Sequence, residues 1–365
     1  MIAMCLAAGQ RTVPEDFAVH SCHCYFLLAG SDELPILFHV EKIRDGRSFA
    51  TRTVQARQKG RCIFTTTISF VRNNSSGRRQ VSHASPMPLG EDGRPLLPPP
   101  DDFDAEPELL NQGPFQGHRI EVINKEDHAH GQKTRQWVRA RGKIIGGQQE
   151  HLNALAYVSD SYFIGTIGRI HRLWRFPFRP EDIHKLPEEM QKRVRVLNEW
   201  EGMGDTDGMS GQPEIGMMVS LDHTIYFHEP WKVRADEWML NEMESPWSGD
   251  GRGVVIQKIF SKDGTLLATC MQEVMLSPPP GACVVWVANL IIAGRCPFKR
   301  CTQRRDKRDE TLGLIFSIAY LFVLWRMYSR RDFVAIYRRF LRRRNRITTS
   351  PYRVSEVSFS VPSCT

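Results

Sequence analysis

The sequence lacks any Cys-x-x-Cys pair, and its nine cysteines are an odd number scattered along 365 residues. A disulfide framework needs an even set of cysteines, and a structural zinc site needs clustered cysteine or histidine ligands. Cys296 and Cys301 have neither a histidine nor a second cysteine pair nearby. These absences argue against a disulfide scaffold and against a metal site, and they favour free thiols in a reducing compartment.

Long apolar runs are missing as well. The two most apolar stretches, 281–294 and 312–325, are each fourteen residues long, whereas a membrane-spanning helix needs about 18 or more. The opening residues, MIAMCLAAGQRTV, lack the basic segment with which a secretory signal begins. We therefore expect neither a secretory signal nor an ordinary spanning helix.

The net charge of +8 is unevenly distributed. Residues 278–365 carry 17 Lys and Arg against 5 Asp and Glu, whereas residues 1–277 carry 32 against 36. The main body is thus mildly acidic, and its charge does not support a nucleic-acid partner. Basic runs follow both apolar stretches of the tail. The tail 278–365 predicts either a membrane-associated segment on anionic lipid or sequence that is not native to the protein.

A break in composition divides the main body in two. Residues 73–117 are rich in Pro, Gly, Ser and Asp without an apolar period, which is typical of a linker. Residues 1–72 contain three strand-like runs separated by RDGR and QKGR. Both turns suit hairpins, because Asp-Gly and Lys-Gly tolerate positive φ. The predicted strands of this first block are 35–43, 47–57 and 61–71.

Residues 118–277 predict one or two further strands, a helix and a second β block. Apolar residues at mixed helical spacing place the helix at about 148–161. Residues 171–215 read as a charged, Gly-rich connection. The strands of the second β block are predicted at 216–228, 232–244, 252–260 and 265–276.

The two β blocks resemble each other. The motif DGR at 45–47 recurs at 250–252, an offset of 205 residues, and Gly60 recurs as Gly264, an offset of 204. Two copies of one α+β unit are the simplest account of this similarity. The first copy opens with the end of a helix, so we expect its leading strand to be missing from this chain.

The stretch GMMVSLDHTIYFHEPW at 216–231 alternates apolar and polar residues, which predicts a half-buried strand. Unbroken alternation puts His223 on the apolar face, and Ser220 with Asp222 on the opposite, mostly polar face. Asp222 and His223 then point to opposite sides and cannot form a dyad, and no third ligand has the spacing of a metal site. We expect His223 to be a hydrogen-bonded core histidine.

Several longer motifs carry a resemblance to a known family. YVSD, MVSLDHTIYFHEPW, DEWMLNEMESPWSGDGRG and DGTLLATCMQE resemble the C-terminal half of the acyl-CoA thioesterase II family, and HSCHCYFLLAG with FHVEKIRDGRSFATRTVQARQKGRCIFTTTISF resembles its N-terminal half. The resemblance covers about residues 1–277 without the linker. It implies an α+β double hotdog, two helices wrapped by antiparallel sheets. The first hotdog (1–72) would be incomplete, and the second (118–277) would hold the catalytic residues.

The resemblance also implies which residues act. The family's helix-end Asp falls on Asp160, its strand Thr or Ser on Ser220, and its last-strand Gln on Gln272. The implied reaction is hydrolysis of fatty acyl-CoA without cofactor or metal. Asp160 would activate a water as general base, and Ser220 and Gln272 would help to hold that water. We do not expect Ser220 to be a nucleophile, because no histidine is placed to activate it.

Four further residues are candidates for substrate contacts. Backbone N–H groups at the start of the predicted helix, at Gly146 and Gly147, are expected to stabilise the oxyanion. Arg47 and Arg252 lie in the two DGR turns, and they are candidates for the CoA phosphates because arginine binds phosphate bidentately. Charged residues at hairpin ends are equally ordinary surface residues.

Two other functions compete with hydrolysis. An incomplete first hotdog favours a catalytically inactive acyl-CoA-binding or membrane-associated protein. A hotdog dehydratase would pair a histidine with an acidic residue on the helix, but His151 has no such partner there. The resemblance also implies association of copies through their sheets and a peroxisomal location. The chain ends PSCT instead of a Ser-Lys-Leu-type tripeptide, which leaves a cytoplasmic location as the alternative.

Overall fold

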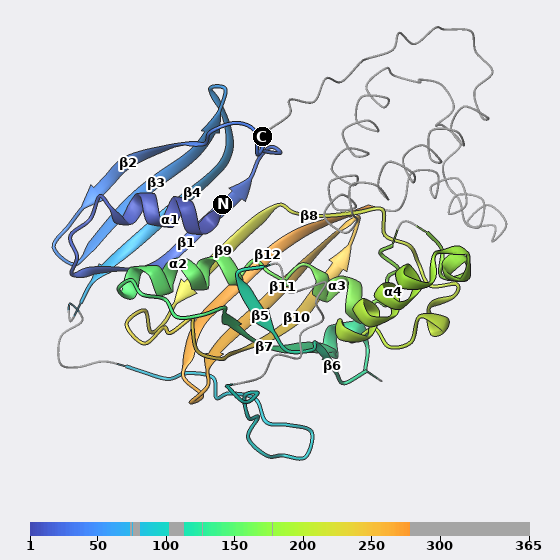
Figure 1. Cartoon of the computed structure of the whole chain (residues 1–365). Helices are drawn as coiled ribbons and strands as arrows, with labels where there is room; N and C mark the ends of the chain where they lie inside the picture. The colour runs from blue at the N-terminus through green and yellow to red at the C-terminus, as the bar shows by residue number, and fades with distance from the viewer. Residues whose placement is uncertain (74, 76–80, 102–112, 126, 177, 278–365) are drawn as a thin grey trace, which may run out of the picture. The chain divides into compact units, whose positions relative to one another are not determined.

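The computed structural model describes residues 1–73, 75, 81–101, 113–125, 127–176 and 178–277 (Figure 1). The predictions made for the tail 278–365, including its membrane contact, lie outside the described residues. Within the described part, no helix is both long enough and apolar enough to cross a membrane.

The first half of the molecule consists of one helix and four antiparallel strands in the order β2-β3-β4-β1. The three strands predicted here are confirmed within about two residues at each end, and β1 is an additional strand that the sequence patterns did not indicate. Gly9 of the helix approaches this sheet closely, since a Cβ there would lie 3.1 Å from Ile68 Cδ1. The elements are α1 (Ile2–Gln10), β1 (Phe17–Phe26), β2 (Leu37–Asp45), β3 (Phe49–Gln58) and β4 (Arg61–Arg72).

The second half repeats this arrangement and extends it. Strands β9-β12-β11-β10 continue outward through β7 and β5, while β6 pairs with β7 and β8 pairs with β12. The elements are β5 (Phe115–Gly117), β6 (Glu121–Ile123), β7 (Lys133–Ala140), α2 (Gln148–Val158), β8 (Met217–Ser220), β9 (Asp222–Phe227), β10 (Met239–Gly249), β11 (Arg252–Ser261) and β12 (Leu266–Ser277).

Antiparallel pairing of β1 with β9 joins the two halves into one 12-stranded sheet. The register runs from Ser21 opposite Tyr226 to Tyr25 opposite Asp222. On either side of this junction the strands follow the same order, β1-β4-β3-β2 and β9-β12-β11-β10, which matches the internal repeat seen in the sequence. The α+β class with a large antiparallel sheet is therefore confirmed.

The helices α1 and α2 run antiparallel, because the side chain of Gln10 at the end of α1 bonds to that of Gln149 at the start of α2. Both helices contribute to one large apolar core with the strands behind them, and Figure 1 shows α1 lying across the strands of the first half. Residues such as Leu6, Leu152 and Leu155 are at most 1% exposed. Each such burial is worth about 1.5–3 kcal/mol.

The two predicted hairpin turns of the first half behave differently. Lys59 and Gly60 have φ of 48° and 75°, as expected for a tight turn between β3 and β4. The turn at Asp45 and Gly46 does not use positive φ. Glycine is required there for another reason, because a Cβ on Gly46 would lie 2.9 Å from the carbonyl oxygen of Phe49.

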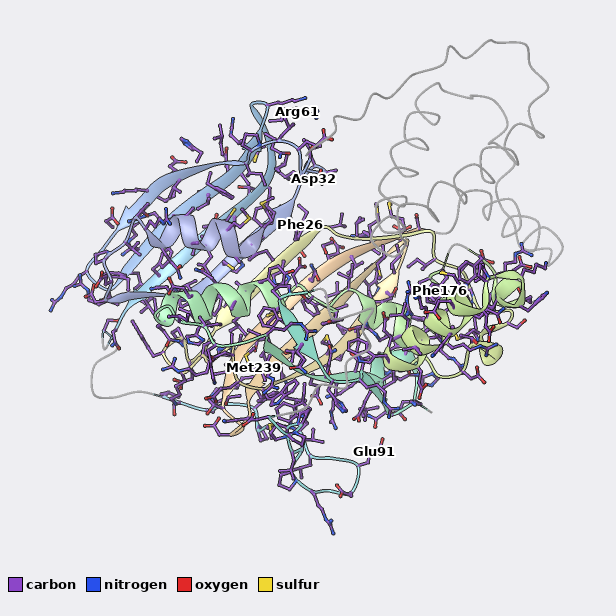
Figure 2. All side chains as sticks on the ribbon, in the orientation of Figure 1. Phe26, Asp32, Arg61, Glu91, Phe176 and Met239 are labelled. Carbon is purple, nitrogen blue, oxygen red and sulfur yellow. The ribbon has the colours of Figure 1, made fainter. Side chains whose placement is uncertain are left out.

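Residues 171–215 are folded, so their assignment as a connection is wrong. This helical segment contains α4 (Glu188–Trp200) and two 3-10 turns, Pro180–Lys185 and Thr206–Met209. It has a small core of its own, on which Phe176 and Phe178 pack. Phe176 is labelled in Figure 2. The apolar residues of that core are too widely spaced to give a local period: they are Trp174, Ile183, Val194, Met203 and Met209.

Candidate functional site

The C-terminal end of α2 presents Asp160. The helix ends at Val158, and the next residue, Ser159, is fully buried, with its Oγ donating to the carbonyl oxygen of Ala156 (3.1 Å). The chain then leaves the helical path, because Tyr162 adopts a φ of 63°. Asp160 lies in this turn and keeps 35% of its side chain exposed. A carboxylate so placed remains accessible to water.

Gln272 on β12 meets Asp160 directly. Its Nε2 donates to Asp160 Oδ1 at 2.8 Å, although the two residues are 112 positions apart in the chain. Gln272 is fully buried, and its Oε1 has no hydrogen-bond partner among the described residues. A buried amide oxygen without a partner is costly. This oxygen therefore has an unused capacity to accept a hydrogen bond.

Ser220 reaches the same face of the sheet because of a β-bulge. Cys270 of β12 lies opposite Ile225, and continuing that register would put Val274 opposite Leu221. Val274 instead lies opposite Ser220, so the strand carries one extra residue at this point. Directly opposed residues share a face, and Val274 is buried on the same face of β12 as Gln272. The prediction that Ser220 lies on the face opposite His223 is therefore wrong.

The bulge has its own support. Leu221 N donates to the carbonyl oxygen of Glu273 (2.9 Å), and Glu273 N donates to Asp222 Oδ1 (2.7 Å). Burial raises the pKa of Asp222 above its ordinary value, and the bond from Glu273 partly opposes this. Val219, which simple alternation would bury, is 37% exposed. Asp222 thus acts as an anchor for the bulge on the side away from Gln272.

His223 is the core histidine that the sequence predicts. It is 0% exposed, its Nε2 forms a 3.0 Å hydrogen bond with Ser159 Oγ, and Phe163 meets its ring edge-on. Its Nδ1 lies 4.0 Å from Asp160 Oδ1. Burial lowers the pKa of His223 to about 4, against a smaller opposing effect of Asp160. The ring is therefore neutral near pH 7, and it packs beside Asp160 as an uncharged neighbour.

The predicted oxyanion site at Gly146 and Gly147 lies at the opposite end of α2 from Asp160. Gly147 is the N-cap of this helix, whereas Asp160 follows its C-terminal end. A rise of 1.5 Å per residue separates them by about 20 Å. Their N–H groups therefore cannot stabilise an oxyanion on a carbonyl held beside Asp160.

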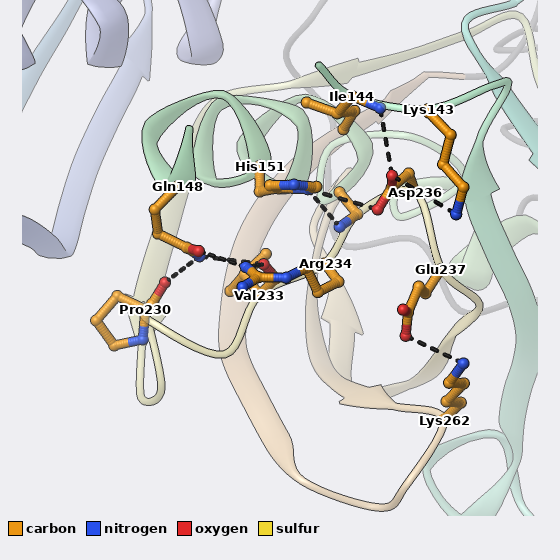
Figure 3. Close-up of polar contacts among 11 residues, drawn as sticks. Lys143, Ile144, Gln148, His151, Pro230, Val233, Arg234, Asp236, Glu237 and Lys262 are labelled. Atoms are coloured by element: carbon orange, nitrogen blue, oxygen red, sulfur yellow. Dashed lines mark hydrogen bonds and ion pairs between the residues drawn. The ribbon is translucent and has the colours of Figure 1, made fainter. Parts of the chain in front are cut away.

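The N-terminal end of α2 is instead an anchoring region (Figure 3). Gln148 Nε2 donates to two carbonyl oxygens of the β9–β10 connection, at 2.6 and 3.1 Å. His151 Nδ1 accepts the N–H of Ala235 (3.2 Å) and lies 3.7 Å from Asp236 Oδ1. His151 thus has an acidic neighbour after all, but from another element. Because its Nδ1 is occupied by a backbone donor, the arrangement fixes the connection and does not resemble an acid–base pair.

Of the two candidate phosphate-binding arginines, Arg47 lies in the β2–β3 turn and Arg252 is the first residue of β11. Arg252 Nη1 donates to Glu273 Oε1 (2.7 Å), and its guanidinium lies 5.6 Å from the ring centroid of Trp247. Glu273 follows Gln272 on β12 and so faces the opposite side of the sheet. Arg47 is exposed in the β2–β3 turn. These contacts favour a surface role for Arg252, and a role in binding phosphate stays a prediction for both.

A polar hollow of about 1020 Å³ lies elsewhere on the molecule. It is bordered by the turn at 90–92, by β6 and by the end of α4, with acidic and basic side chains mixed. Its lining does not include Asp160, Ser220 or Gln272. Within the described residues, no group of three His, Cys, Asp or Glu side chains is arranged to hold a metal ion.

Comparison with known proteins places the chain in a family. Residues 1–71 match the model of the acyl-CoA thioesterase N-terminal domain, and residues 95–276 match that of the acyl-CoA thioesterase C-terminal domain. Human acyl-coenzyme A thioesterase 8 is 33% identical over 304 residues, which cover 77% of this chain and 80% of the human protein. The chain belongs to the acyl-CoA thioesterase family.

Other family members extend the match. The peroxisomal acyl-coenzyme A thioester hydrolase 1 of Saccharomyces cerevisiae is 24% identical over 306 residues, covering 75% of this chain and 83% of its own. The crystal structure of acyl-CoA thioesterase II TesB2 from Mycobacterium marinum is 28% identical, with a TM-score of 0.52, over 76% of this chain and 88% of that one. The predicted family and its double-hotdog fold are thereby confirmed.

Proposed function

We propose that this chain hydrolyses fatty acyl-CoA thioesters to free acid and CoA, at a site built from Asp160, Gln272 and Ser220. The observation that carries the proposal is the bond between Gln272 Nε2 and Asp160 Oδ1 beside a buried, unpartnered Gln272 Oε1. Family membership supplies the reaction class, and this polar pair supplies a place for the attacking water.

Asp160 would act as the general base. Gln272 occupies Oδ1 of the carboxylate, which leaves Oδ2 to accept a hydrogen bond from water. As the water oxygen bonds to the thioester carbonyl carbon, its proton passes to Asp160. Collapse of the tetrahedral intermediate breaks the carbon–sulfur bond, and the departing CoA sulfur takes that proton back. The base is regenerated, and the water has been divided between the acid and the thiol.

Ser220 and Gln272 would position the water. A hydroxyl and an amide can both donate and accept hydrogen bonds without competing as bases. Ser220 acting as a nucleophile is not supported, because His223 Nε2 is bonded to Ser159 and burial lowers the pKa of the ring to about 4, which makes it a weak base. Holding the water in line with the carbonyl contributes through orientation, which can be worth several powers of ten in rate.

The test is CoA release from palmitoyl-CoA by the purified chain, with the signal of its own thiols subtracted. We expect turnover that falls at least about 100-fold in Asp160→Asn, as for loss of a general base. Asp263→Asn, in the β11–β12 turn, is the matched control and should keep full activity. Circular dichroism checks that each variant is folded. Binding of a non-hydrolysable acyl-CoA without turnover would replace this proposal with that of an inactive binding protein.

The proposed location is peroxisomal. It is supported by the name of the yeast relative, whereas the last residues, PSCT, differ from a Ser-Lys-Leu-type signal. Imaging of the chain carrying a fluorescent protein at its N-terminus would test this. A diffuse cytoplasmic signal would contradict it.

A further inference from the structure

A buried arginine ties the turn that carries Asp160 to the helical segment 171–215. Arg169 lies in α3 (Gly165–Ile170) and is 4% exposed. Its Nη1 donates to the carbonyl oxygen of Tyr162 (2.9 Å), and its Nη2 lies 3.3 Å from Glu201 Oε2. Glu201 follows directly after α4. One guanidinium therefore spans from the residue two positions after Asp160 to the end of α4.

The turn needs such support. Tyr162 has a φ of 63°, a left-handed conformation that is unfavourable for a bulky side chain and that persists only where surrounding contacts enforce it. Two contacts do so here. Arg169 binds the Tyr162 carbonyl, and the Tyr162 ring packs against Trp200 with centroids 5.7 Å apart. Trp200, like Glu201, comes from the helical segment.

Glu201 forms ion pairs with two arginines, Arg169 and Arg175. Its other oxygen, Oε1, lies 3.2 Å from Arg175 Nη2, so one carboxylate pairs with two guanidinium groups. Burial lowers the pKa of Arg169, and Glu201 opposes that effect. The space is filled closely, since a Cβ on Gly165 would lie 2.7 Å from Arg169 Nη1. Without Glu201, Arg169 would be a buried charge with its main counterion removed.

We propose that Glu201 and Arg169 are positioning residues that hold the Asp160 turn in its reactive orientation toward Gln272. The inference rests on the proposed function, since it assigns these residues to the same hydrolysis. It also gives the helical segment 171–215 a role: α4 braces the site through Glu201 and Trp200. A 1 Å displacement of Asp160 would separate it from Gln272 Nε2 and misplace the water.

The experiment compares two variants with a matched control. Glu201→Gln should lower kcat for palmitoyl-CoA about tenfold and leave KM within about twofold, together with a lower Tm. The double variant Arg169→Met with Glu201→Gln also removes the buried charge that Glu201→Gln leaves without its counterion, so it should recover Tm. It should not recover kcat, because the Tyr162 carbonyl has lost its donor. Glu199→Gln, an exposed carboxylate of the same helix, should match the wild type in all three quantities.

The outcomes separate positioning from simple stabilisation. Recovery of kcat together with Tm in the double variant would show that the pair only stabilises the fold, and would overturn the proposal. Hydrogen exchange at 159–165 gives a readout that does not depend on turnover, and it should be faster in Glu201→Gln than in Glu199→Gln. An inactive wild type would contradict the proposed function. If Glu201→Gln still speeds exchange at 159–165 in that case, Glu201 and Arg169 do hold the turn and only the proposed function fails. If exchange is unchanged as well, both proposals fail.

Discussion

The two halves of the sheet place chemically different residues at the same repeat position. At the offset of 204 residues that relates the two turn glycines, Gln272 corresponds to Ile68. Both side chains are fully buried. Ile68 packs against Gly9 of α1, whereas Gln272 binds Asp160 after α2. One apolar contact between helix and strand thus has a polar counterpart in the other half.

The connections that follow the two helices differ in length, and the longer one is again in the half that contains Asp160 and Gln272. In the first half, residues 11–16 link α1 to β1, whereas residues 159–216 link α2 to β8. The longer link contains the left-handed turn at Tyr162, the α3 arginine and the segment that braces it. The first half is a packing unit with a short loop. The second half combines the same packing with a loop long enough to hold a strained turn.

Making the second half resemble the first should have the largest effect on activity. Gln272→Leu places an apolar side chain where Ile68 stands in the first half, and it removes the bond to Asp160. We expect kcat to fall about 100-fold, a typical loss for a positioned catalytic group. Tm should be unchanged or higher, because a buried amide with an unpartnered oxygen is also removed. Ile68→Val is the control, with a stability loss of about 1 kcal/mol and full activity.

His23 on β1 and His223 on β9 should differ in their effect on how stability depends on pH. Burial holds the pKa of His223 at about 4, below its ordinary 6.5. The unfolded chain therefore binds the proton at higher pH, and stability is full above about pH 6.5 and declines toward pH 4, by roughly 3 kcal/mol from this group. His223→Leu should reduce that decline in urea unfolding. His23→Leu, at an exposed site on β1, should not, and equal slopes would contradict the assignment.

Substitutions of Ser220, beside the β-bulge, test whether its hydroxyl contributes to activity. Ser220→Ala removes a hydroxyl from the face shared with Gln272, and we expect kcat to fall about tenfold, near the value of one hydrogen bond to a water. Ser220→Thr keeps the hydroxyl and should retain most of the activity. Steady-state kinetics of the two variants test this, and equal rates for alanine and threonine would remove Ser220 from the site.

The equivalent arginines of the two hairpins should matter least. Arg252 is bonded to Glu273 and packed near Trp247, and Arg47 is exposed. If both are surface residues, Arg252→Ala and Arg47→Ala each change KM for palmitoyl-CoA by less than about twofold, since exposed ion pairs contribute little. An increase above tenfold in either variant would restore the phosphate-binding role.

Local patterns predicted the hairpins well. The strands on either side of Lys59 and Gly60 were recognisable because alternation and turn residues lie within a few positions of each other. The trio Asp160, Ser220 and Gln272 came from the family resemblance. The structure brings Asp160 and Gln272 into contact, while the assignment of all three as catalytic stays a prediction.

Features that depend on distant partners were not predictable. The bulge beside Ser220 is visible only when the register of β12 is known. The bond between Arg169 and Glu201 joins residues 32 positions apart. By contrast, helix length alone could have excluded Gly146 and Gly147 from the oxyanion site, and Val194, Leu197 and Trp200 show a helical spacing that could have revealed α4.

The pairing of β1 with β9 has a consequence for proteolysis. Five residues of each strand lie opposite one another in the antiparallel pairing across the junction of the two halves, and residues 73–114 connect the halves along the chain. A protease cut between residues 73 and 114, before β5 begins at Phe115, would break the covalent connection but not the sheet. The two fragments should therefore stay together on a sizing column under native conditions and separate only in denaturant, so the molecule should work as a split protein.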